Sequence, residues 1–99
     1  MTIEKAQNGD ALSLKVSGRL DTVTAPQLSD ALTASLEGAQ SLRLDFSELE
    51  YISSAGLRVL LQAQKTMQKR GGMVVSHPNE TVMEVLDVTG FSDILTIEK

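Results

Sequence analysis

The segment of the chain that offers most chemistry runs from residue 45 to residue 57, around two neighbouring serines, Ser53 and Ser54. Their hydroxyl groups could cap a helix or act as nucleophiles. With Ser54 as the N-cap of a helix, its hydroxyl lies beside the unpaired amides of the first turn. Gly56 leaves that turn without a bulky side chain, so a partner could approach the backbone closely. Simple capping by both serines remains the alternative.

A catalytic role for Ser54 is not supported by the rest of the sequence. A serine nucleophile needs a base, and the only histidine, His77, stands in a predicted turn before Pro78. No Gly-x-Ser-x-Gly motif surrounds Ser54. His77 has no second histidine or cysteine to complete a metal site, and no glycine-rich phosphate-binding motif with its lysine is present. We therefore expect a protein that is not an enzyme and has no cofactor.

Composition favours a protein as the partner. The 99 residues carry a formal net charge of -4, which opposes binding to nucleic acid phosphates. Three aromatic residues are too few for a base-stacking surface. No stretch approaches the roughly 18 apolar residues of a membrane span, and the first ten residues do not resemble a signal peptide. The absence of cysteine fits a reducing compartment. We expect a cytoplasmic location and no direct membrane insertion.

The first elements that position the serines form a β-hairpin. Apolar and polar residues alternate over residues 11–17, which predicts a strand buried on one face. Before it, Asn8 and Gly9 are typical of a two-residue hairpin turn, and residues 2–6 can supply the partner strand.

A helix is predicted after the hairpin. Residues 24–27 resemble a capping box that begins at Thr24, and Val23 and Leu28 have the spacing of a hydrophobic staple. Gly38 is placed to end this helix. A second alternating strand then covers residues 41–46.

The second helix is predicted to begin at Ser54 and to stop at Gly71 and Gly72. A buried strand follows at residues 73–75. Asn79 can cap a third helix that ends at Gly90, and residues 94–97 can form the last strand.

This order of elements predicts an α/β domain that spans residues 1–99. Strands that alternate with helical crossovers imply parallel pairing and right-handed connections. The strands at 11–17 and 41–46 each have a polar face, so helices should cover one side of the sheet. We predict a one-sided β-α superhelix with a mainly parallel five-stranded sheet and an N-terminal antiparallel hairpin strand. Asp21 and Asp45 would stand at neighbouring strand ends beside Ser54, as partner contacts or as ordinary turn residues.

Several motifs resemble those of a known family, the STAS-domain anti-sigma factor antagonists. Residues 51–61, preceded by residues 44–47, resemble the phosphorylation-site signature of that family. Residues 18–21 resemble its Gly-x-Leu-Asp segment, and residues 71–75 and 88–91 resemble later family features in the same order. The resemblance covers about residues 8 to 97.

The resemblance implies a partner switch. A GHKL-type serine kinase that doubles as an anti-sigma factor would phosphorylate Ser54, and a metal-dependent serine phosphatase would reverse the reaction. The unphosphorylated antagonist would bind the kinase and free the sigma factor. Ser53 stands where several relatives carry aspartate. The expected partner-binding residues are Asp21, Asp45, Ser53, Ser54, Gly56, Leu57 and Arg58.

Two other functions are open for such a domain. It could be a constitutive interaction subunit of a lipid-transport or other membrane complex, with Ser54 only capping a helix. The same switch could also control secretion or another output in place of a sigma factor. Fold alone does not separate these functions.

Overall fold

The chain opens with the predicted hairpin. The computed structural model describes residues 1–99 and pairs β1 (Thr2–Asn8) with β2 (Ala11–Leu20) in antiparallel fashion. Gly9 lies at the turn with a φ of 64°, a conformation that glycine adopts without steric cost. β2 continues to Leu20, three residues beyond the expected end, because its last residues pair with a strand that the sequence pattern did not reveal.

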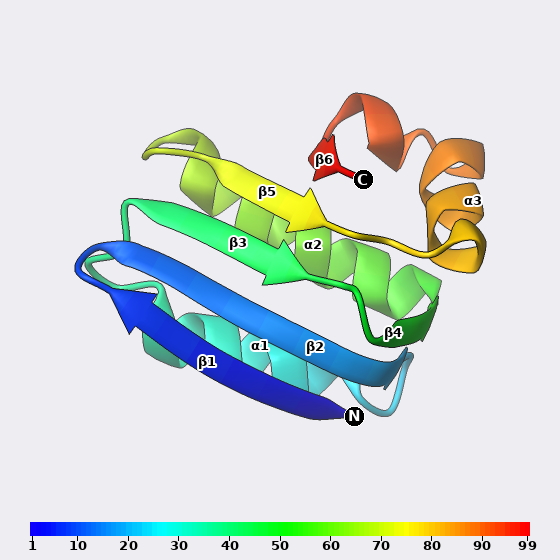
Figure 1. The fold of residues 1–99 in the computed structure, drawn as a ribbon, viewed down its shortest axis with the longest axis horizontal. Coiled ribbons are helices and arrows are strands. Elements are labelled where there is room, and N and C mark those ends of the chain that lie inside the picture. Colours follow the sequence, from blue (N-terminus) through cyan, green and yellow to red (C-terminus); the bar gives the residue numbers. More distant parts are fainter.

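The sheet has the order β1-β2-β3-β5-β6, and the three strands that follow β2 in this order run parallel to it (Figure 1). Those strands are β3 (Ser41–Asp45), β5 (Met73–Ser76) and β6 (Thr96–Glu98). The predicted fold class is confirmed, but the sheet has six strands, not five. β6 begins two residues later than expected because a short 3₁₀ helix, η1 (Phe91–Asp93), follows Gly90.

The additional strand is β4 (Leu49–Ile52), which pairs with the far end of β2. β2 pairs with β3 up to Lys15 and Asp45, and with β4 from Gly18 onward. β3 and β4 therefore lie one after the other along the same edge of β2, separated by the turn at residues 46–48 (Figure 1).

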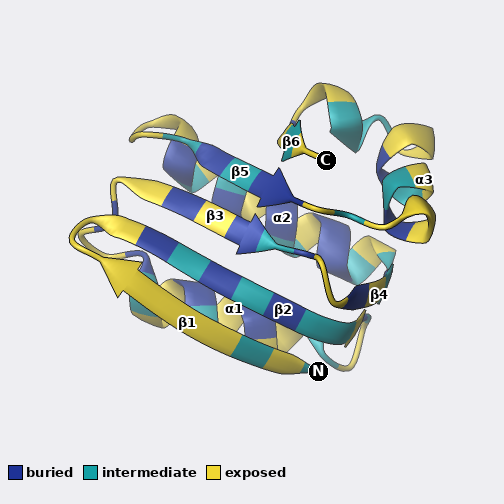
Figure 2. Cartoon of the chain, viewed as in Figure 1, coloured by how far each residue is buried: buried dark blue, intermediate teal, exposed yellow.

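Helices cover one face of the sheet, as predicted. α1 (Ala25–Ser35) and α2 (Ser54–Gln68) lie behind the sheet in Figure 1, and α3 (Glu80–Val88) packs near β4. Along β2 and β3 the buried residues alternate with more exposed ones, while β1 is largely exposed (Figure 2). Twenty-three apolar residues form one core, and the most enclosed large side chains include Leu14, Leu28, Leu44, Phe46, Ile52, Leu60 and Leu86. Each helix is too short or too polar to cross a lipid bilayer.

The beginning of α1 differs from its prediction. Thr24 is the N-cap residue, but its side chain makes no capping hydrogen bond, so the predicted capping box is wrong. Val23 is 86% exposed, so it forms no hydrophobic staple with Leu28. Hydrogen bonds to the Asp21 carboxylate order this segment instead of a capping box and a hydrophobic staple. The prediction for α3 is confirmed, since the Asn79 side chain accepts a hydrogen bond from the Val82 amide at 2.8 Å.

Candidate functional site

The two serines occupy different positions at the start of α2. Ser53, with extended backbone angles of φ -104° and ψ 177°, is the N-cap residue, and Ser54 is the first residue of the helix. The prediction that Ser54 is the N-cap is therefore wrong by one residue. No side chain caps this helix; the Ser53 hydroxyl is buried without a partner, and Ser54 is exposed. The hydroxyl of Ser54 is thus a surface group that capping does not occupy.

A backbone hydrogen bond joins the start of α2 to the loop after β2. The Ser53 amide donates to the Leu20 carbonyl at 2.9 Å, which continues the pairing of β4 with β2. Asp21 follows Leu20 directly, so the loop that it begins lies next to the first turn of α2. The sequence prediction that Asp21 stands at a strand end beside Ser54 agrees with this arrangement.

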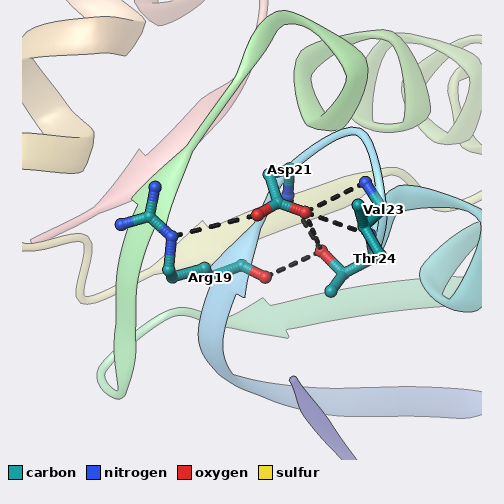
Figure 3. Close-up of polar contacts among 4 residues, drawn as sticks. All are labelled: Arg19, Asp21, Val23 and Thr24. Atoms are coloured by element: carbon teal, nitrogen blue, oxygen red, sulfur yellow. Dashed lines mark hydrogen bonds and ion pairs between the residues drawn. The ribbon is translucent and has the colours of Figure 1, made fainter.

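Asp21 orders the loop between β2 and α1 (Figure 3). Its Oδ1 accepts hydrogen bonds from the Val23 amide at 3.0 Å and from the Thr24 amide at 3.1 Å. The Thr24 hydroxyl accepts from the Asp21 amide at 2.9 Å and lies 2.7 Å from the Arg19 carbonyl, to which it can donate. Mainly because of the hydrogen bond from the Thr24 amide, the pKa of the Asp21 carboxyl is lowered.

Arg19 adds a link between β2 and β4 that the sequence analysis did not predict. Its guanidinium carbon lies 4.4 Å from the centroid of the Tyr51 ring, and its Nε lies 3.9 Å from Asp21 Oδ2. Arg19 and Tyr51 are opposite one another in the β2–β4 register. Only knowledge of β4 could have revealed this pair, because the two residues are far apart in the sequence.

Gly56 and Leu57 do not lie on the surface. A methyl group on Gly56 would stand 2.7 Å from Leu20 Cγ and 2.9 Å from Ile52 Cγ1. Gly56 therefore faces the core, and these two side chains already occupy the space that a side chain at this position would need. The interpretation that Gly56 opens the helix to a partner is therefore wrong. Leu57 is 5% exposed and belongs to the core, so its side chain is not available to a partner.

Asp45 also lies away from Ser54. It ends β3 opposite Lys15, whereas β4 ends at Ile52 opposite Leu20. Five residues of β2 separate these positions, which corresponds to roughly 16 Å at about 3.3 Å per residue. The Asp45 carboxylate accepts from the Ser47 amide at 2.9 Å, and this bond is the main cause of its lowered pKa. Asp45 thus orders the turn that leads into β4, and the prediction that it lies beside Ser54 is wrong.

Four of the predicted site residues remain at one end of the molecule. Ser54 and Arg58 are exposed one helical turn apart on α2, Ser53 precedes them, and the Asp21 loop lies alongside. His77 is elsewhere: its amide donates to the Glu98 carbonyl of β6, an edge strand separated from β2 by β3 and β5. No three histidine, cysteine or acidic side chains are grouped closely enough to hold a metal ion. The arrangement places an exposed hydroxyl, an exposed guanidinium and an ordered acidic loop on one surface.

Comparison with known proteins identifies the family of this chain. The model of the "Mlab, STAS domain" family matches residues 3–96. The anti-sigma-B factor antagonist of Bacillus subtilis is 28% identical over 98 residues, covering 98% of this chain and 90% of its own. Since the family model spans nearly the whole sequence, the chain belongs to the STAS domain family, and the resemblance noted in the sequence is confirmed.

Solved structures agree with the fold. An anti-sigma factor antagonist from Mycobacterium paratuberculosis superposes with a TM-score of 0.89 at 26% identity, covering 98% of this chain and 84% of the other. The Bacillus protein SpoIIAA in its phosphorylated form superposes with a TM-score of 0.75 at 14% identity, covering 99% and 92%. The second likeness concerns the fold alone.

Proposed function

We propose that this protein is an anti-sigma factor antagonist that acts as a phosphorylation-controlled partner switch through Ser54. The observation that carries the proposal is an exposed hydroxyl at the first residue of α2, free of any capping role, beside a loop ordered by Asp21. The names of the curated relatives supply the expected partner, an anti-sigma factor. In the unphosphorylated state the surface around Ser54 binds the anti-sigma factor, and the sigma factor that the anti-sigma factor held is thereby released.

The proposed kinase is of the GHKL type and uses ATP. The Ser54 Oγ would attack the γ-phosphorus, forming a new P–O bond as the bond to ADP breaks, and the hydroxyl proton would pass to a base of the kinase. A metal-dependent phosphatase would transfer the phosphoryl group to water and restore the hydroxyl. The added charge is about -1.5 to -2, enough to oppose docking of a partner that fits a neutral hydroxyl.

The start of α2 is suited to carry this charge without unfolding. An anion at the first turn of a helix interacts favourably with the unpaired amides and the helix dipole. The first turn of α2 has no acidic residue that would repel a phosphate. The existence of a phosphorylated form of SpoIIAA, a relative in fold, supports the view that this architecture tolerates the modification.

Replacement of the acceptor tests the proposal directly. We expect Ser54→Ala to abolish phosphorylation by a candidate GHKL kinase and to preserve binding, with phosphate stoichiometry measured by mass spectrometry. Because Ser54 is exposed and makes no cap, its loss should change the free energy of unfolding by no more than about 0.5 kcal/mol. Ser53→Ala is the matched control, since the buried Ser53 hydroxyl should not be accessible to a kinase. Equal phosphorylation of Ser54→Ala and wild-type protein would show that the acceptor lies elsewhere.

The modified protein provides the second test. Phosphorylation of Ser54, or more weakly Ser54→Asp, should reduce kinase affinity at least about tenfold, or roughly 1.4 kcal/mol, measured by titration calorimetry. Circular dichroism should be nearly unchanged because α2 accommodates an anion at this end. Undiminished affinity of the fully phosphorylated protein would contradict the switch.

A constitutive role as an interaction subunit of a membrane complex is the second candidate, because membership of the STAS domain family does not by itself require a switch at Ser54. A subunit of this kind would copurify with its partner whatever the state of Ser54, and Ser54→Asp would not release it. Affinity purification of wild-type and Ser54→Asp proteins from the native host distinguishes the two functions.

A further inference from the structure

Arg58 differs from the other arginines of the chain in having no partner. The sequence contains four arginines. The structure has two ion pairs, and Arg58 takes part in neither. The other three are engaged: Arg19 with Asp21, Arg43 with Glu98, and Arg70 with the backbone carbonyls of Leu36 and Ala39.

The position of Arg58 relates it to Ser54. The two residues stand four apart on α2 and are both exposed. At this spacing the Cβ atoms of a helix lie about 5–6 Å apart, and an anion placed N-terminal to a cation is the favoured order. α2 contains no aspartate or glutamate, so the helix itself offers Arg58 no carboxylate. A phosphate on Ser54 would be the first anion within its reach on this helix.

The neighbouring elements do not compete for Arg58. In the loop between β2 and α1, the Asp21 carboxylate is occupied by Arg19 and by the amides of Val23 and Thr24. From α1, Asp30 lines a shallow groove of about 340 Å³ with Ala55 and Val59 of α2 but forms no ion pair. On β4, Glu50 is exposed and also unpaired. The guanidinium of Arg58 is therefore available either to an external acidic group or to a phosphate on its own helix.

We propose that Arg58 is a cation shared between two states: it binds an acidic side chain of the partner when Ser54 is unmodified, and the phosphate when Ser54 is phosphorylated. This inference rests on the proposed function, because it requires that Ser54 carry a phosphate. Phosphorylation then changes the surface around Ser54 in two ways. It adds a dianion, and it withdraws the one unpaired arginine from the partner.

The pairing with phosphate can be measured without a kinase. Phosphoserine is installed at position 54 of the full chain by a phosphoserine-specific suppressor tRNA, and its second ionisation is followed by ³¹P NMR titration. An i,i+4 pair worth about 0.2–0.5 kcal/mol should lower the phosphate pKa by about 0.2–0.4 units relative to Arg58→Gln. Arg58→Lys should retain part of the shift, and Lys65→Gln, about three turns from Ser54 along α2, should retain all of it. Equal pKa values in wild type and Arg58→Gln would overturn the pairing.

The pairing with the partner is measured in the unmodified protein. Calorimetry with the kinase that phosphorylates Ser54 should give severalfold weaker binding for Arg58→Gln than for wild type, with Lys65→Gln unchanged. Unaltered affinity of Arg58→Gln would overturn the shared-cation proposal. If instead no candidate kinase modifies Ser54, the proposed function fails, while the ³¹P titration still reports on the pairing itself.

Discussion

At the scale of single residues, the two serines show how one position along a chain changes what a hydroxyl can do. Ser53 lies outside the first turn of α2 with its oxygen enclosed and unpaired, whereas Ser54 begins the helix and faces solvent. Because the two residues are adjacent serines, capping preference alone could not decide which of them is the N-cap of α2. The pairing of β4 with β2 determines which serine turns outward.

The first prediction at this scale concerns Gly56. Alanine normally favours a helix over glycine by about 0.8–1 kcal/mol, but here the added methyl would meet Leu20 and Ile52 at less than 3.0 Å. We expect Gly56→Ala to destabilise the domain by about 1–3 kcal/mol, as overpacked core positions do. Urea denaturation gives the free energy of unfolding. Ser54→Ala, which adds helix propensity in the same turn without a clash, is the control; greater stability of Gly56→Ala than of wild type would contradict the packing.

The second concerns pH and Asp21. The folded-state pKa of this carboxyl lies below the usual value of 3.8, so its charged form is favoured in the folded protein. The resulting stability is present above about pH 3.8 and is lost as the pH falls through the lower folded pKa. We therefore expect Asp21→Asn, which keeps the acceptor oxygen but removes the charge, to lose less stability than wild type as the pH falls from 5 to about 2.5. Melting temperatures measured by circular dichroism across this window test the difference.

The comparison with Asp21→Asn needs a control variant that removes a carboxylate which accepts no hydrogen bond from a backbone amide. Glu84→Gln is suitable because Glu84 lies exposed on α3 and takes part in neither ion pair. Its melting temperature should follow that of wild type through the whole pH range. If Asp21→Asn and Glu84→Gln behave alike, the hydrogen bonds to Asp21 do not stabilise its charged form as described.

At the scale of elements, α2 and α3 begin in the same backbone geometry but are held differently. Ser53 and Asn79 are both extended N-cap residues. The Asn79 side chain accepts from the Val82 amide and donates to the Leu49 carbonyl at 2.9 Å, so it also ties α3 to β4. Ser53 makes no such bonds. α2 therefore depends on its packing against the sheet rather than on its cap.

This contrast predicts unequal effects of the same substitution. Asn79→Ala should lower the free energy of unfolding by about 1–2 kcal/mol because an occupied cap is lost. Ser53→Ala should change it by no more than about 0.5 kcal/mol, since it removes no hydrogen bond. Chemical denaturation of the two variants in parallel provides the measurement. A cost for Ser53→Ala equal to that for Asn79→Ala would mean that the Ser53 hydroxyl has a partner in solution.

At the scale of the whole molecule, the features read correctly from the sequence are those with local causes. Asn8 and Gly9 specify a turn by their backbone preferences, Asn79 caps α3 by accepting from an amide three residues further on, and alternation marks β2 and β3. The features that were missed arise from contacts distant in sequence. β4 is only four residues long, and Leu49 and Ile52 become a strand because the end of β2 is there to pair with them.

The residues of the candidate site also divide into those that the local sequence reveals and those that depend on contacts distant in sequence. Ser54, Asp21 and Arg58 were found because their motif or their place after a strand is visible in the sequence. The burial of Gly56 and the distance of Asp45 depend on how α2 and β4 lie against β2, which no window of sequence contains. Arg19 and Tyr51 escaped notice for the same reason.

The double pairing of β2 has a consequence for the order in which the molecule opens. Residues 11–15 of β2 are bonded to β1 along one edge and to β3 along the other, so their amide protons should be among the slowest to exchange with deuterated solvent. The three-residue β6, at the edge of the sheet, should exchange much sooner. Exchange followed by NMR would contradict this if the two strands lost their protons together. Asp21 directly follows the end of β2 that pairs with β4, and β3 and β5 separate β2 from β6, so fluctuations that free the C-terminal edge should leave the loop beside Ser54 in place.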